Sequence, residues 1–142
     1  ASLGSDVVIN YRTEDFASIV KDLGGADVIV DNMGAKYLAK NVSALAPDGR
    51  LVVIGLQGGV TAELNLGALL AKRGSLFTTS LRSRSTAAKS AICTSVVEHV
   101  WPLIAQGKVR PIVHAEYSLD DVRTAHEVLE ASTHVGKVLL LT

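Results

Sequence analysis

The sequence predicts an α/β fold in which helices cover both faces of a parallel β-sheet. Two runs, residues 26–31 (ADVIVD) and 51–54 (LVVI), hold apolar residues that follow one another without alternation. Such runs are typical of strands buried on both faces, whereas a half-exposed antiparallel strand alternates apolar with polar residues. A helical segment lies between the two runs, in the β-α-β order that parallel strands require. Together these observations predict a doubly wound sheet.

The first third of the chain is predicted to add a strand and two helices to this pattern. A short β-branched run at residues 7–9 predicts a strand, and Thr13 is a candidate N-cap for the helix that follows. That helix has apolar residues at the i, i+3, i+4, i+7 spacing of one buried face: Phe16, Ile19, Val20 and Leu23. Glycines at residues 24–25 end it. A second helix is predicted over residues 35–46, before a Pro-Asp-Gly turn at residues 47–49.

Further helices and strands are predicted in the rest of the chain. Helical spacing recurs over residues 66–72, a strand is predicted over residues 75–80, and a long helix over residues 86–105. Pro102 is expected to bend the last turn of the long helix, because proline cannot continue the helical hydrogen bonding.

The C-terminal part has a different character. Residues 109–117 predict an interrupted strand, and Pro111 within it suits the edge of a sheet. Ser118 and Asp121 resemble a capping box, with aspartate in place of glutamate, at the start of another helix. Residues 136–141 predict the final strand.

Composition excludes several classes of protein. Among 142 residues, 14 are basic and 14 acidic, so the net charge of +0 provides no field for nucleic acid or anionic lipid. The single cysteine, Cys93, excludes a disulfide within the chain and any Cys-x-x-Cys zinc site. The longest apolar run, residues 138–141, is too short to span a bilayer. We therefore expect a cytoplasmic protein that binds neither nucleic acid nor membrane.

Three segments are candidates for a ligand site. Residues 32–34 (NMG), 55–59 (GLQGG) and 81–84 (LRSR) each follow a predicted strand, and ligands of doubly wound sheets bind at the carboxyl ends of the strands. Arg82 and Arg84 suit a phosphate or carboxylate, although a solvated loop also carries such charges. Glycines in these segments also serve simply to turn the chain, so both interpretations stay open.

Other signals of chemistry are missing. The chain has no Gly-x-Gly-x-x-Gly phosphate loop. Its histidines lack metal-ligand spacing and no nucleophile is placed with them: His99, His114, His126 and His134. We therefore predict no catalytic residue and no metal ligand in this chain.

Five segments together resemble one family: residues 8–11 (VINY), 46–52 (APDGRLV), 72–76 (KRGSL), 81–84 (LRSR) and 134–138 (HVGKV). They are similar to the C-terminal portion of zeta-crystallin-like NADPH:quinone oxidoreductases, a branch of the medium-chain dehydrogenase/reductase superfamily. The resemblance implies a zinc-independent homodimer that transfers hydride from NADPH to a quinone or other conjugated carbonyl. Alternatives are a zinc-free enoyl reductase of the same superfamily and a noncatalytic, truncated dimerisation module.

The resemblance also implies a division of the chain. Residues 1–107 would form the C-terminal part of a Rossmann-like nucleotide-binding domain, and residues 108–142 a C-terminal segment of a GroES-like catalytic domain. In the usual strand order 3-2-1-4-5-6, residues 7–9 would be strand 3 and residues 26–31 strand 4. The two intervening strands are not in the sequence, so we expect residues 7–9 to lack a neighbour and residues 26–31 to expose an edge.

Site residues follow from the resemblance position by position. Tyr11 matches a tyrosine beside the 2′-phosphate of NADPH. Ser132 falls near the position where relatives place an arginine or asparagine on the cofactor phosphate. The remaining matches lie near the ribose and nicotinamide: Met33, Gly34, Leu56, Gln57, Gly58, Leu81, Arg82 and Ser83.

The predicted dimer uses one strand, which begins at Ser75 and ends at Leu81. This strand contains no proline and no charge that would discourage pairing with its twofold copy. The alternative is that the loop around residues 64–66 covers this edge.

Overall fold

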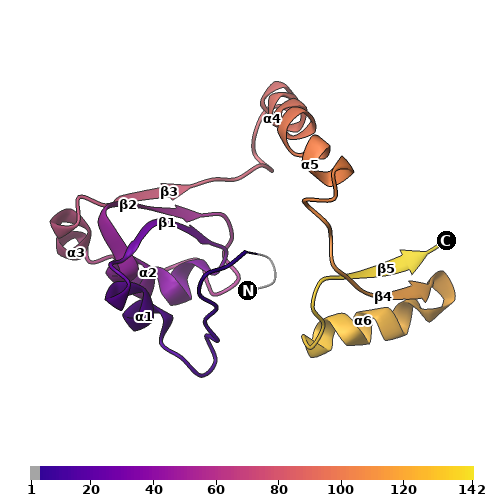
Figure 1. The fold of residues 1–142 in the computed structure, drawn as a ribbon, viewed down its shortest axis with the longest axis horizontal. Coiled ribbons are helices and arrows are strands. Elements are labelled where there is room, and N and C mark those ends of the chain that lie inside the picture. Colours follow the sequence, from indigo (N-terminus) through magenta and orange to yellow (C-terminus); the bar gives the residue numbers. More distant parts are fainter. Residues whose placement is uncertain (1–3) are drawn as a thin grey trace. The chain divides into compact units, whose positions relative to one another are not determined.

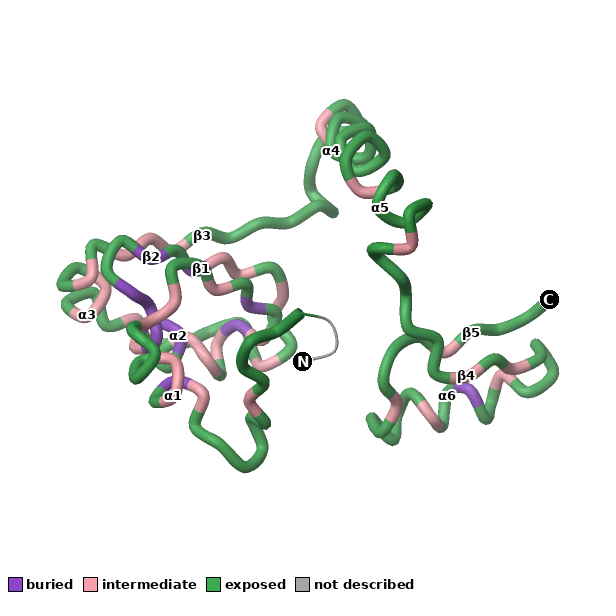
Figure 2. Tube along the Cα trace, viewed as in Figure 1, coloured by how far each residue is buried: buried purple, intermediate pink, exposed green. Residues whose placement is uncertain are grey.

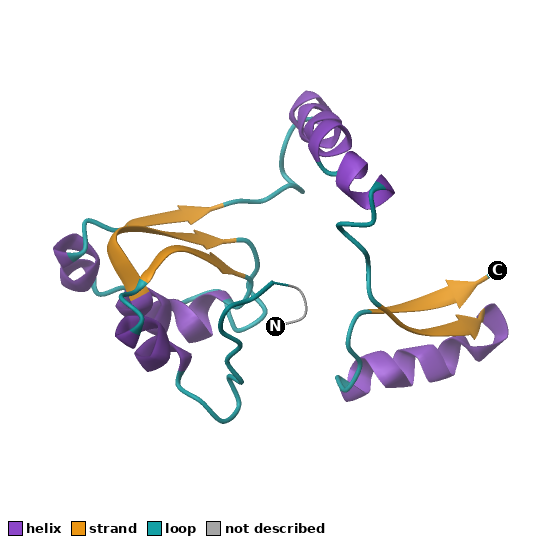
Figure 3. Cartoon of the chain, viewed as in Figure 1, coloured by secondary structure: helices purple, strands orange, loops and turns teal. Residues whose placement is uncertain are grey.

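The computed structural model describes residues 4–142. They form two compact units, the first ending at Ser83 and the second beginning at Arg84. Figure 1 labels their elements, and Figure 3 shows that each unit has a β-sheet of its own. The predicted boundary at Gly107 divides the chain differently, by the domains of a longer enzyme, and stays a prediction.

The sheet of the first unit is entirely parallel, as the continuous apolar runs predict. It contains β1 (Ala26–Asp31), β2 (Leu45–Val53) and β3 (Ser75–Thr78) in the order β1-β2-β3. Ile29, Leu51 and Leu76 are aligned across the three strands. The predicted α/β class is therefore confirmed.

One face of this sheet is covered. The helical elements of the unit are α1 (Phe16–Asp22), the 3-10 helix η1 (Gly34–Tyr37), α2 (Leu38–Ala44) and α3 (Leu66–Ala71). The core consists of Val42, Leu45 and Leu51, which Figure 2 shows as part of a buried stretch of α2 and β2. Val28 and Val30 alternate with the core-facing Ile29 and stay 54% and 65% exposed, so the opposite face of β1 is uncovered within this unit.

The prediction of a strand at residues 7–9 is wrong. These residues form no strand, and Val7 and Val8 are at least half exposed. A strand needs a neighbour to accept its backbone hydrogen bonds, and no described segment pairs with this one. Both parts of the topological prediction are confirmed, since residues 7–9 have no strand neighbour and β1 lies at the edge of its sheet.

The predicted cap of α1 is also wrong, because a local turn precedes the helix. The Thr13 and Glu14 amides both donate to the Asn10 carbonyl, and the Glu14 side chain accepts from the Asn10 amide at 2.7 Å. This closed turn delays the helix, whose N-cap is Asp15.

The transition from α2 to β2 differs in detail from the prediction. The helix ends at Ala44, two residues early, and the Pro-Asp-Gly turn lies within the bounds of β2. The pairing with β1 is irregular there, with Leu45 opposite Ala26 but Arg50 opposite Val28, so residues 46–49 bulge out. The predicted turn thus exists as a bulge.

Lys72 connects this bulged region to the end of α3. Its ammonium donates to the Ser43 carbonyl at 3.0 Å and to the Leu45 carbonyl, at the C-terminal end of α2. We expect Lys72→Met to lower the free energy of unfolding by about 1–2 kcal/mol, because charge-assisted bonds to two part-buried carbonyls are lost. Urea denaturation measures this change, and the exposed Lys36→Met is the control that should leave it unchanged.

The second unit contains a parallel β-α-β arrangement. β4 (Val113–Ser118) pairs with β5 (Lys137–Leu141), and η2 (Leu119–Asp121) and α6 (Val122–Ala131) connect them. With only two strands in this sheet, β4 lies at an edge, as predicted. Pro111 lies outside the strand.

The long predicted helix of this unit is interrupted. It consists of α4 (Thr86–His99) and α5 (Trp101–Ala105), separated at Val100, two residues before Pro102. The apolar face predicted for the long helix is partly exposed to solvent, since Ile92 is 37% exposed and Ile104 is 46% exposed. None of the helices within residues 4–142 is long and apolar enough to cross a membrane.

The predicted capping box at the start of α6 does not form in its usual way. The Ser118 hydroxyl donates to the Asp121 carboxylate at 2.8 Å, and no side chain caps a backbone amide there. The 3-10 turn η2 between Ser118 and α6 moves the first α-helical residue beyond the reach of the serine.

Candidate functional site

The loops that follow β1 and β2 lie side by side at the carboxyl ends of these strands. Three backbone hydrogen bonds join them: Gln57 N to Asn32 O at 3.2 Å, Gly58 N to Met33 O at 2.7 Å and Ala35 N to Gly59 O at 3.1 Å. The structure therefore brings together two of the three segments that the sequence analysis selected.

A buried carboxylate fixes the first of these loops. Asp31, the last residue of β1, is 5% exposed. Its two oxygens accept hydrogen bonds from the Met33 amide at 2.8 Å and the Gly34 amide at 2.9 Å. Sequence reasoning did not select Asp31 as a site residue, although an acidic residue that ends an apolar strand three residues before a glycine was a visible signal.

Packing between the loops requires glycine at two positions. Gly34 has a φ of +72°, and a Cβ there would lie 2.8 Å from Leu56 Cδ2 and 3.0 Å from the Gly59 carbonyl. A Cβ on Gly58 would lie 2.8 Å from Lys36 Cβ. These glycines therefore permit a close approach of two loops, in addition to turning the chain.

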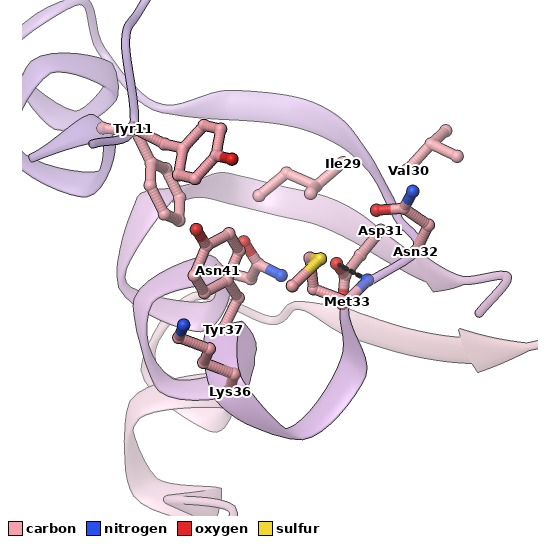
Figure 4. A pocket seen from close by; sticks show the side chains of 10 residues that line it. Tyr11, Ile29, Val30, Asp31, Asn32, Met33, Lys36, Tyr37 and Asn41 are labelled. Carbon is pink, nitrogen blue, oxygen red and sulfur yellow. Dashed lines mark hydrogen bonds between the residues drawn. The ribbon is translucent and has the colours of Figure 1, made fainter. Parts of the chain in front are cut away.

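A pocket of about 570 Å³ opens beside the first loop. Figure 4 shows Tyr11 and Tyr37 on one side of it and Met33 on the other. The Phe16 and Tyr37 rings pack at 5.3 Å between centroids, so the wall is aromatic. Such a wall suits a flat apolar ring.

Asn41 of α2 lies deep in this pocket. The residue is 3% exposed, and its Nδ2 is the one buried side-chain nitrogen or oxygen in the described part of the chain that has no hydrogen-bond partner. In Figure 4 its amide lies between Tyr37 and Met33. A ligand with a hydrogen-bond acceptor would satisfy this group.

A second hollow, lined by three basic side chains and one acidic one, shares Tyr11, Phe16, Lys36 and Tyr37 with the pocket. Arg12, Lys40 and the acidic Glu14 complete the lining of this hollow of about 410 Å³. Hydrogen bonds from Lys40, at 2.8 Å, and from Ser18 hold the pKa of Asp15 below its usual value. A hydrogen bond with Tyr11 raises the pKa of Arg12. The hollow therefore suits an anionic group such as phosphate.

The other predicted site residues lie elsewhere. Leu81, Arg82 and Ser83 are exposed beyond the end of β3 and do not line the pocket. Ser132 is the C-cap of α6, with a φ of +52°, in the second unit. Their roles stay predictions.

The described residues do not assemble a set of metal ligands. Within residues 4–142, no three side chains of His, Cys, Asp or Glu come close enough together to hold an ion. The rings of His114 and His134 meet edge to face, with 6.1 Å between centroids, but they form only a pair.

A parallel sheet with joined glycine loops and a pocket at its carboxyl edge is the architecture of a nucleotide-binding α/β protein. The chain belongs to the zinc-binding dehydrogenase family, whose profile matches residues 3–140. This finding confirms the predicted place in the medium-chain dehydrogenase/reductase superfamily.

Curated relatives include several quinone oxidoreductases. Quinone oxidoreductase 1 of Escherichia coli is 30% identical over 143 residues, and the quinone oxidoreductase of Salmonella typhimurium is 32% identical over the same length. Each alignment covers 97% of this chain and 43% of the relative. A 2-haloacrylate reductase of Burkholderia is 28% identical, and its alignment covers 98% of this chain and 43% of the reductase. The chain thus spans less than half the length of these relatives.

Solved structures agree with this assignment. A quinone oxidoreductase of Pseudomonas syringae superimposes with a TM-score of 0.79 at 25% identity, covering 99% of this chain and 44% of that one. A mycobacterial protein complexed with NADPH superimposes with a TM-score of 0.73 at 29% identity. The match covers 98% of this chain and 43% of that protein. An NAD-dependent alcohol dehydrogenase superimposes with a TM-score of 0.76 at 27% identity. The match covers 99% of this chain and 39% of that dehydrogenase.

Proposed function

We propose that this chain is the cofactor-binding portion of a zinc-independent, NADPH-dependent quinone oxidoreductase. The observation that supports it most is the pair of hydrogen-bonded glycine loops at the carboxyl ends of β1 and β2, in a chain that is similar to quinone oxidoreductases. One similar solved structure is an NAD-dependent dehydrogenase and another is a complex with NADPH, so the feature they share is a nicotinamide cofactor.

The chemistry of the reaction comes from the nicotinamide. When bound, NADPH would supply a hydride, which carries two electrons and one proton, and the quinone would take its second proton from water. The protein positions the cofactor, binds its charged groups and excludes water from the contact. Tyr11, Arg12 and Lys36 surround the proposed phosphate position, while the joined loops offer backbone and small residues to the sugar and ring.

The direct experiment measures NADPH oxidation by the full-length polypeptide with quinones as acceptors. We expect turnover with a quinone and a slower rate with NADH. Failure of the full-length protein to oxidise either nicotinamide would overturn the proposal and favour the noncatalytic dimerisation module.

A related activity has support of its own. The similarity to a 2-haloacrylate reductase favours activated carbon–carbon double bonds as alternative acceptors. An assay that compares a quinone with an α,β-unsaturated carbonyl and with 2-chloroacrylate separates the quinone reductase from an enoyl reductase. We also propose that the protein is cytoplasmic.

Cofactor selectivity is tested at Tyr11. We expect Tyr11→Ala in the full-length enzyme to raise the KM for NADPH about tenfold, equivalent to about 1.4 kcal/mol, and to leave the KM for NADH unchanged. The reason is that Tyr11 and its neighbour Arg12 line the basic hollow and would contact only the extra phosphate. Tyr11→Phe serves as the control that keeps the ring. Equal efficiency of the unmodified enzyme with NADH would contradict the assignment.

A further inference from the structure

We propose that Asp31 is a positioning residue for the nicotinamide half of the bound dinucleotide. Its buried carboxylate sets the relative position of the loops that follow β1 and β2, and these loops would hold the nicotinamide ring and its ribose. The inference rests on the proposed function. It deepens that function by assigning a role to a residue that neither the sequence motifs nor the family resemblance selects.

The first argument is the set of backbone amides that Asp31 binds. Its carboxylate oxygens accept hydrogen bonds from the amides of Met33 at 2.8 Å, drawn in Figure 4, and of Gly34 at 2.9 Å. Its own carbonyl accepts a further hydrogen bond from the amide of Ile54 at 2.7 Å. Ile54 directly follows β2, so Asp31 binds both the first loop and the start of the second.

The second argument is the effect of these bonds on the rest of the first loop. The amides of residues 33 and 34 bind the carboxylate, and the carbonyls of residues 32 and 33 bind the second loop. They accept hydrogen bonds from Gln57 N at 3.2 Å and from Gly58 N at 2.7 Å. Gly34 completes the turn with a φ of +72°. The register between the two loops therefore depends on the conformation that the carboxylate imposes on residues 32–34.

The third argument is the place of these loops in the sheet. Ligands of doubly wound sheets bind outside the carboxyl ends of the strands, and each half of such a sheet binds one mononucleotide. In the usual strand order β1, β2 and β3 are strands 4, 5 and 6, which form the second half. The glycine-rich phosphate loop and the acidic residue that binds the adenosine ribose belong to the first half. The loops after β1 and β2 therefore face the nicotinamide half.

The competing interpretation is that Asp31 only stabilises the fold. Asp31→Asn separates the two, because it keeps the volume of the side chain but not its acceptors. A carboxylate has acceptor oxygens alone, whereas a carboxamide would place its own N–H group against one of the two backbone amides. In a purely structural role this loss would lower the Tm and leave the ligand affinity of the folded enzyme unchanged.

The test uses the full-length enzyme with NADPH and with adenosine 2′,5′-bisphosphate, which lacks the nicotinamide half. In calorimetric titrations well below the Tm, we expect Asp31→Asn to raise the Kd for NADPH about tenfold and to leave the Kd for the bisphosphate unchanged. The nicotinamide fluorescence of NADPH bound to this variant should shift toward that of free NADPH, because the ring is less closely held.

Leu45→Ala is the control for loss of stability. Leu45 is 1% exposed and pairs with Ala26, the first residue of β1, at the opposite end of the strands from the loops. Its truncation leaves a cavity and should lower the Tm, but both Kd values should stay unchanged.

An unchanged Kd for NADPH in Asp31→Asn overturns the inference, whatever happens to the Tm. An equal rise in both Kd values also overturns it, because the carboxylate would then act on the whole site. If Asp31→Asn does not fold, Asp31→Ser, whose hydroxyl accepts from one amide, is judged by the same two Kd values. Failure of the unmodified enzyme to bind NADPH would instead contradict the proposed function, so the two failures are distinguishable.

Discussion

Gly34→Ala should be the most damaging substitution in the site. We expect the full-length enzyme to lose at least tenfold in affinity for NADPH and to unfold at a lower temperature. A side chain at a φ of +72° is strained, and here its Cβ would also lie 2.8 Å from Leu56 and 3.0 Å from the Gly59 carbonyl. The two loops would have to separate, which moves the Met33 edge of the pocket.

Gly24→Ala is the matched control for this prediction. Gly24 has a comparable φ of +99°, but a Cβ there would meet nothing within 4 Å. It should therefore show the cost of backbone strain alone, about 1–2 kcal/mol, with no change in cofactor affinity. Calorimetric titration and thermal unfolding measure both quantities. Equal effects of the two substitutions on NADPH affinity would contradict the role of the loop contact.

Thr78→Pro should dissociate the proposed homodimer. β3 is the outer strand of its sheet, with a free edge. The Thr79 amide donates inward to the Val53 carbonyl of β2 at 3.2 Å, and amides of successive strand residues alternate in direction, so the Thr78 amide points to the free edge. Proline at this position removes an outward donor without removing a bond to β2.

The measurement for this prediction is sedimentation of the full-length protein. We expect the dimer to dissociate with a Kd raised at least tenfold, while circular dichroism of the variant stays unchanged. Thr78→Val keeps the amide and should leave the dimer intact. A monomeric unmodified protein would contradict the interface, and would favour the alternative in which the loop around Leu64 covers this edge.

Elements with a strong pattern of their own could be predicted from the sequence. β1 has the predicted bounds and α6 carries the predicted apolar residues, whereas β2 begins earlier, at Leu45, and β3 ends at Thr78, before the predicted Leu81. The run at residues 7–9 has the same composition but forms no strand, because a strand also depends on a neighbour that local sequence does not reveal. Bounds at α1 and α2 shifted for a similar reason, since turns and bulges depend on tertiary partners.

The candidate site was predicted in part. Glycines after strands indicated the two loops correctly, and the resemblance selected Tyr11 and Met33, which both line the pocket. Asp31 and Asn41 were missed, because their importance comes from burial and from hydrogen bonds made or lacking. Burial and hydrogen bonding cannot be read from the sequence alone, although the position of Asp31 at the end of an apolar strand was a signal that Asn41 lacked.

The hydrogen bonds between the loops after β1 and β2 also bear on the speed of ligand binding. Because these loops are fixed to each other and to the Asp31 carboxylate in the protein without ligand, their ordering entropy is lost during folding and not at each encounter. This part of the site is preorganised, so its rate of association should depend on diffusion and on the basic hollow beside Tyr11. Amide hydrogen exchange at Gly58 should accordingly be slow before the ligand arrives as well as after.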